Sequence, residues 1–189
     1  MLSIELSVST NRLLKVLLVT CITLFITACG SNSVSDGKES DTPRVMDSDR
    51  TYTIEDFRSA TGVKVVKDYE VDELPGAIEV WNTIYNRLDY EVRFYKSHKE
   101  AVSQGTRYAD SVTGEDAVVT GDEVLWEEGK KDRRKCSRAA QTPHSSCTYS
   151  ARYLEYVIRG NIILFCEGDE STEAFKNCSN LMGVIESPT

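Results

Sequence analysis

The first 28 residues decide which part of the chain can fold and in which compartment. Arg12 and Lys15 precede a twelve-residue, strongly apolar stretch from Val16 to Thr27, and a small residue follows. This order is typical of a secretory signal peptide. The segment before Arg12 is long for such a peptide, so a start downstream of Met1 stays open. Removing 28 of the 189 residues leaves 161, about the length of one domain, which we expect to fold in an oxidising environment.

The junction Ile26-Thr27-Ala28-Cys29 resembles the lipobox of bacterial lipoproteins, in which an aliphatic residue, a small residue and Ala or Gly precede a Cys. The resemblance implies that the Cys29 sulfur receives a diacylglyceryl group and that cleavage makes Cys29 the first residue. Two acyl chains suffice for stable membrane anchoring. Cys21 fits the motif less well because Thr20 precedes it. Gly30 follows Cys29 where some inner-membrane lipoproteins have Asp, which favours an outer membrane if the cell has one.

Composition separates a tether from a folded part. Residues 30–49 are rich in Ser, Asp and Gly, so we expect the lipidated Cys and a flexible tether over 29–50. A single domain is expected over 51–189, with a loop-rich insertion at about 113–150. A net charge of −8 argues against a nucleic-acid partner, and 40% apolar residues suffice for a core.

Apolar periodicity predicts the elements of the first half. A near capping box at Thr53 predicts a helix over 54–61, and valines predict a strand over 63–66. Alternating residues predict strands over 77–85 and 89–95 with a hairpin turn between them. A capping box at Ser97 begins a helix to about Val112. Gly105 lies on its apolar face, which suggests close approach to the sheet beneath.

The end of the chain reads as a hairpin followed by a helix. Gly160-Asn161 fits a two-residue turn, which sets Ile158 against Ile163 and Tyr156 against Phe165. A final helix is predicted over 171–182. The whole order predicts an α+β fold: an antiparallel sheet of about four to five strands, with two or three helices packed on one face and a disulfide-stapled C-terminal half.

This layout weakly resembles a group of uncharacterised small bacterial envelope lipoproteins. The shared features are a Thr-x-x-Asp helix at Thr53, a strand–helix unit over 92–109 and a late hairpin with Arg159-Gly160-Asn161. The resemblance covers most of residues 53–182. It implies no particular activity.

Four cysteines remain for pairing within the domain: Cys136, Cys147, Cys166 and Cys178. Four cysteines allow three connectivities, of which we favour the sequential pairs 136–147 and 166–178. One difficulty is that Cys166 lies opposite the apolar face of Phe165, so pairing with Cys178 would need a bend in the strand. Zinc is the alternative, suggested by His144-x-x-Cys147, but the cysteine spacings are too long. No metal or cofactor is therefore expected.

A basic run is the charge feature that stands out from the acidic background. We interpret it as a contact for an anionic envelope component or protein partner; the alternative is a solvated loop. Its members are Lys130, Lys131, Arg133, Arg134, Lys135 and Arg138.

No catalytic constellation can be recognised in the sequence. The chain lacks a Gly-x-Ser-x-Gly elbow and a glycine-rich phosphate loop, and its carboxylates follow no pattern. The leading hypothesis is therefore a lipid-anchored, non-catalytic binding or interaction domain on the exported side of a bacterial membrane. One alternative is a small-ligand binder or sensor with a pocket between sheet and helices, and a less favoured one is an envelope enzyme.

Overall fold

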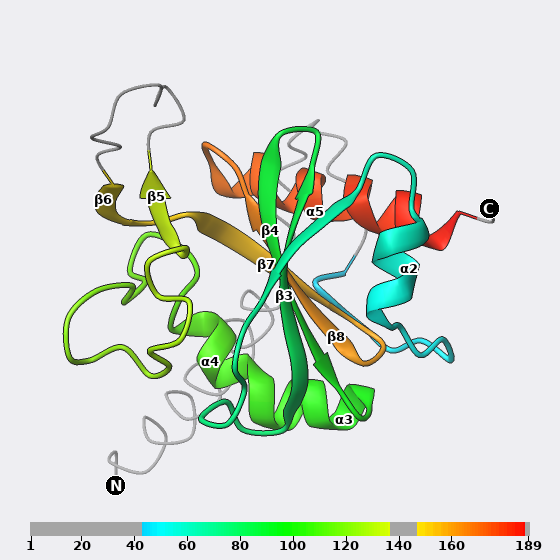
Figure 1. The fold of residues 1–189 in the computed structure, drawn as a ribbon, viewed down its shortest axis with the longest axis horizontal. Helices are drawn as coiled ribbons and strands as arrows, with labels where there is room; N and C mark the ends of the chain where they lie inside the picture. Colours follow the sequence, from blue (N-terminus) through cyan, green and yellow to red (C-terminus); the bar gives the residue numbers. More distant parts are fainter. Residues whose placement is uncertain (1–42, 137–146, 188–189) are drawn as a thin grey trace, which may run out of the picture. The chain divides into compact units, whose positions relative to one another are not determined.

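The computed structural model describes residues 43–136 and 147–187, which contain a six-stranded mixed sheet (Figure 1). The strand order is β1-β7-β8-β4-β3-β2, and β5 and β6 form a separate two-stranded sheet. The strands are β1 (Val45–Met46), β2 (Lys64–Asp68), β3 (Ala77–Tyr85), β4 (Leu88–Tyr95), β5 (Arg134–Cys136), β6 (Cys147–Ala151), β7 (Tyr153–Arg159) and β8 (Ile162–Glu167). There are thus more strands than the four to five predicted.

Two hairpins form the centre of the sheet as predicted. β3 spans the predicted residues, and it turns into β4 through Asn86 and Arg87, both of which have positive φ. In the second hairpin, β7 and β8 pair Ile158 with Ile163 and Tyr156 with Phe165, which confirms the predicted register. Alternating apolar residues and a two-residue turn determine both hairpins locally.

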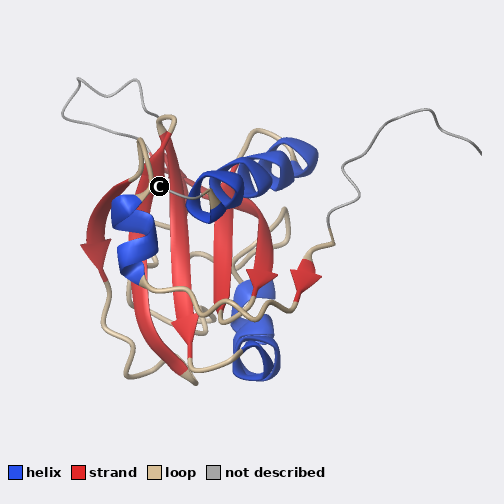
Figure 2. Cartoon of the chain, turned by 90° about the vertical axis from the view of Figure 1, so that its right-hand side faces the viewer, coloured by secondary structure: helices blue, strands red, loops and turns tan. Residues whose placement is uncertain are grey.

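The strand β1 was not predicted, because its residues lie in the segment expected to be tether. Val45 and Met46 pair with Ile158 and Arg159 of β7, and this pairing is parallel, so the sheet is mixed rather than antiparallel. Figure 2 shows this short strand at the right-hand edge of the sheet. The two small strands β5 and β6 likewise lie inside the expected loop-rich insertion.

Helices cover both faces of the sheet, which corrects the prediction of one covered face. On one face, α2 (Ile54–Ser59) and α5 (Ser171–Glu186) pack on β4 and β8. On the other face lie α3 (His98–Glu100), the π-helix η1 (Ala101–Gly105) and α4 (Thr106–Asp110). All six residues of β8 are buried, as expected for a strand covered on both sides.

Gly105 allows the second helical layer to approach the sheet. An added Cβ at this position would lie 2.4 Å from Ile163 Cδ1 and 2.5 Å from the Tyr95 hydroxyl. No larger residue fits without displacing these neighbours, which confirms the close approach predicted from the sequence. Among the helices within 43–136 and 147–187, none is both long and apolar enough to span a membrane.

Candidate functional site

The structure contains the two disulfides that the sequence analysis favoured. Cys136 pairs with Cys147 between β5 and β6, and Cys166 pairs with Cys178 between β8 and α5. The difficulty with Cys166 disappears because α5 covers the face opposite Phe165, so no bend in the strand is needed. Cys29, the predicted lipidation site, lies outside the described residues.

The basic run does not form a single exposed surface, because one of the residues predicted for the anion contact, Arg133, lies in the core. Arg133 is only 1% exposed and points into the core. Lys130 forms an ion pair with Glu127, and Lys135 lies 3.0 Å from Asp169. Lys131 and Arg134 also belong to the described chain, whereas Arg138 does not. Neighbouring acids or the core thus engage three of the six members, and an anion contact through the others stays a prediction.

Arg133 instead belongs to a buried ion cluster that fastens the insertion to the sheet. Its Nε donates to Glu91 Oε2 at 2.8 Å, and Arg93 Nε donates to Glu91 Oε1 at 2.7 Å. Both guanidinium groups also lie over the Trp126 ring, Arg133 at 4.1 Å and Arg93 at 5.1 Å. Burial opposes ionisation of Glu91, but Arg133 and Arg93 outweigh it and hold its pKa below the usual value. This cluster is structural and is buried away from solvent.

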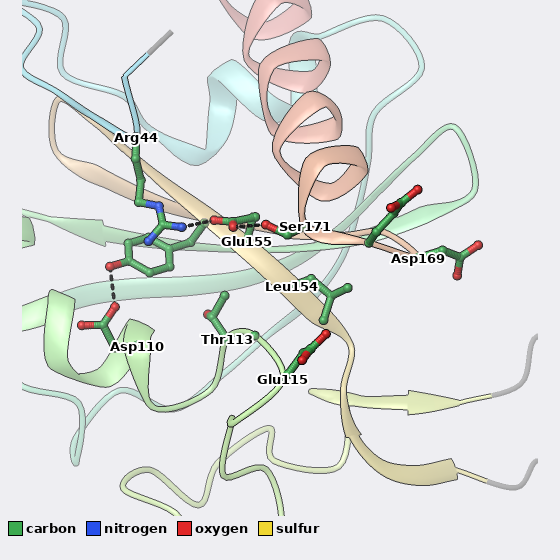
Figure 3. A pocket seen from close by; sticks show the side chains of 11 residues that line it. Arg44, Asp110, Thr113, Glu115, Leu154, Glu155, Asp169 and Ser171 are labelled. Atoms are coloured by element: carbon green, nitrogen blue, oxygen red, sulfur yellow. Dashed lines mark hydrogen bonds and ion pairs between the residues drawn. The ribbon is translucent and has the colours of Figure 1, made fainter. Parts of the chain in front are cut away.

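An open cleft beside β7 is the best candidate for a binding site. Its volume is about 370 Å³. It lies between β7, the end of α4 with the following turn, and the residues that begin α5 (Figure 3). Five of its eleven lining residues are acidic and one is basic; the lining comprises Arg44, Asp110, Thr113, Gly114, Glu115, Leu154, Glu155, Tyr156, Asp169, Glu170 and Ser171.

The cleft has one basic side chain, Arg44, and contacts from two other lining residues hold it in place. Its guanidinium forms an ion pair with Glu155 and lies 5.2 Å from the centre of the Tyr156 ring (Figure 3). Glu155 is 8% exposed, and the hydroxyl of Ser171 donates to its other carboxylate oxygen. A carboxylate and an aromatic face together suit a planar guanidinium, since one neutralises its charge and the other stacks on it.

A second acidic residue of the cleft, Asp110, holds the Tyr156 ring in place. The Tyr156 hydroxyl donates to Asp110 Oδ1 at 2.7 Å, which joins β7 to α4. Burial and this hydrogen bond raise the pKa of Tyr156, so the ring stays neutral at physiological pH. Asp110 therefore holds the Tyr156 ring through a contact that does not involve Arg44.

The lining of the cleft is mainly acidic and polar. Glu155 and Asp110 both accept hydrogen bonds from neighbouring groups, and no histidine or cysteine belongs to the lining. Within the described parts of the chain, no three His, Cys, Asp or Glu side chains are grouped so that they could hold a metal ion. The cleft thus offers a fixed carboxylate and a flat ring to a positively charged group.

Sequence reasoning did not identify the cleft. Its residues come from four separate segments, and Glu155 sits between Leu154 and Tyr156 in an ordinary alternating strand. Only the packing of α4 and the following turn against β7 brings Asp110 to Tyr156. Arg44 is not marked by a local signal either, because Lys38 and Arg50 lie in the same polar stretch of the sequence.

Comparison with known proteins places the chain in a family without assigning it an activity. No curated protein and no solved structure matches the chain. A family of unknown function, DUF6810, matches residues 53–187, which include β2 to β8 and all the helices named above but not β1. The chain therefore belongs to the DUF6810 family.

Proposed function

We propose that this protein is an exported, lipid-anchored binding protein of the bacterial cell envelope, whose cleft beside β7 takes a cationic group of its ligand. The two disulfides are typical of chains that fold in an oxidising, extracytoplasmic compartment. The lipobox-like junction before Cys29 supports the anchor. This proposal keeps the lipid anchor of the leading sequence hypothesis and takes the binding pocket from its small-ligand alternative.

One observation carries the proposal: the cleft already holds a guanidinium. Arg44 pairs with the nearly buried Glu155 and stacks on Tyr156. A carboxylate in such a position needs a cationic partner, because leaving it buried and unpaired is costly. We propose binding rather than catalysis because the two carboxylates that shape the cleft, Glu155 and Asp110, serve as fixed hydrogen-bond acceptors.

The anchor can be tested by metabolic labelling with a palmitate analogue. The wild-type chain should take up the label, and Cys29→Ala should abolish it because the acceptor sulfur is lost. Cys21→Ala is the matched control, since Cys21 precedes the expected cleavage point, and it should label as the wild type does. Label that persists on Cys29→Ala would contradict lipidation at this residue.

The cleft can be tested with arginine amide as the probe. We expect the Arg44→Ala chain to bind it, and the additional change Glu155→Gln to weaken binding at least tenfold, since a charged hydrogen bond contributes about 1.5–3 kcal/mol. Lysine amide should bind more weakly than arginine amide because it lacks the planar group that stacks on Tyr156.

Isothermal titration of the full chain in detergent measures both differences. The matched control adds Glu73→Gln, an exposed carboxylate outside the cleft, to Arg44→Ala and should leave the affinity unchanged. Equal binding by the Glu155→Gln and Glu73→Gln chains would exclude the cleft as the binding site.

A further inference from the structure

The segment that carries Arg44 is a small strap at the edge of the sheet. We use the name strap for residues 43–46, which comprise Pro43, Arg44 and the two residues of β1. Val45 is 45% exposed and Met46 is 39% exposed, so neither buries much apolar surface. The strap pairs with two of the seven residues of β7. In the described chain, the outer edge of β7 over 153–157 has no strand beside it.

Backbone groups make most of the contacts that hold the strap. The Ile158 amide donates to the Arg44 carbonyl at 2.8 Å, and the Gly160 amide donates to the Met46 carbonyl at 3.1 Å. The Arg159 guanidinium donates to the Pro43 carbonyl at 2.7 Å. Such contacts are available to any extended polypeptide, so the side-chain specificity of this edge comes from Arg44 in the cleft.

From this geometry we infer that the strap is an internal competitor, and that the ligand is an arginine-bearing extended segment of another polypeptide. This inference rests on the proposed function of the cleft. The partner segment pairs with the edge of β7, as β1 does, and places its arginine between Glu155 and Tyr156. Glu155 then has a cation in both states, so the exchange leaves no buried charge unpaired.

Charge and edge geometry favour this partner. The cleft is acidic, with five carboxylates in its lining, so it attracts a basic segment and repels an acidic one. Strand addition to a sheet edge supplies affinity through the main chain, while a side-chain pocket supplies specificity. The strap lies within the expected tether over 29–50, so its release would also lengthen the connection between the anchor and the domain.

The strap peptide itself is the probe that tests the inference. A synthetic peptide of residues 41–48 is titrated into the full chain in detergent, as wild type and as Arg44→Ala. We expect the Arg44→Ala chain to bind at least tenfold more tightly than the wild type, because its cleft has lost the internal guanidinium. A peptide with Ala in place of Arg44 should bind neither chain.

Arg58→Ala is a matched control for Arg44→Ala. Arg58 also pairs with a glutamate, Glu55, and stacks on an aromatic ring, Trp81 at 5.1 Å, and the two arginine side chains are 45% and 48% exposed. It lies outside the cleft lining, so its loss should leave peptide binding at the wild-type level. Arg44→Lys keeps the charge without the planar group and should give an intermediate affinity, which provides a second variant if Arg44→Ala is unstable.

The outcomes separate the inference from the proposed function. If arginine amide and the peptide bind the wild type and Arg44→Ala equally well, the cleft binds cations but the strap does not compete, and the inference is wrong. If neither probe binds any variant, the proposed function fails as well. If the wild type instead forms a concentration-dependent dimer that the peptide dissociates, the occupant is the strap of a second copy and the assigned partner is wrong.

Discussion

Glu91→Gln is expected to lower the free energy of unfolding by about 3–5 kcal/mol, the cost of leaving buried charge without its counter-ion. Glu91 and both arginines that it binds, Arg93 and Arg133, are at most 1% exposed. Gln keeps the size of the side chain but removes its charge. Two guanidinium cations would then face each other in the core with no anion between them. Denaturant unfolding with the disulfides intact measures the loss.

Removing a cation from the same cluster should lower the free energy of unfolding by less than Glu91→Gln does. Arg133→Met leaves Glu91 and Arg93 as a balanced pair, so we expect a loss of about 1–3 kcal/mol from missing hydrogen bonds. Glu73→Gln is the surface control and should change stability by about 0.5 kcal/mol at most. If Arg133→Met proved more destabilising than Glu91→Gln, the charge balance of the cluster would not be what stabilises it.

The same cluster gives the protein an acid-sensitive component of stability. The two arginines hold the pKa of Glu91 below its ordinary value of 4.5. The folded state therefore binds this proton less readily than the unfolded state does, and stability falls as the pH decreases below about 4.5. In Glu91→Gln this component is absent, so the stability curve should be flatter in acid.

Loss of the Cys166–Cys178 disulfide has the second-largest expected effect. In the chain-entropy model, a bridge between residues 12 positions apart contributes about 3 kcal/mol. Both cysteines, Cys166 on β8 and Cys178 on α5, are fully buried in the core, so replacing them with Ala also removes packing contacts. We expect the double Ala variant to lose about 3–5 kcal/mol by denaturant unfolding.

The other disulfide provides a comparison at nearly equal loop length. Cys136 and Cys147 are 11 positions apart but join two short strands outside the main sheet. Their double Ala variant should lose at most about 3 kcal/mol, since no core packing is lost with them. If this variant lost as much stability as the 166–178 variant or more, burial of the Cys166–Cys178 bridge in the core would add nothing to its stabilising effect.

Local patterns were sufficient to predict the hairpins and the disulfides. The β7–β8 register follows from alternation around Gly160-Asn161, and β3 matches the alternating segment residue for residue. The sequential cysteine pairing followed from export, since oxidised cysteines close in sequence need only a modest loop. Gly105 revealed a close helix–sheet contact because glycine is otherwise unfavourable within a helix.

Long-range burial could not be predicted in the same way. Glu91 and Arg93 alternate with the apolar residues of β4. This pattern predicts that they lie on the solvent-exposed face of a strand that is covered on one face only. Arg133 lies in a basic run, which usually indicates exposure. Only the packing of the insertion over the second face buries all three, and the two arginines are tolerated there because Glu91 pairs with both.

The strap and the cleft escaped prediction for a related reason. The segment over 43–46 has too few apolar residues to suggest a strand, and its pairing with β7 joins positions more than 100 residues apart. Glu155 has no distinguishing neighbour in the sequence. Its environment arises from Arg44 and Ser171, which come from opposite ends of the domain.

A crystal structure of the Arg44→Ala chain grown with saturating arginine amide tests the central claim most directly. The account predicts density for the bound guanidinium between the Glu155 carboxylate and the Tyr156 ring, in the place that the Arg44 side chain occupies in the wild type. Arginine amide bound elsewhere, or a cleft without it at saturation, would contradict the claim that this cleft recognises a cationic group.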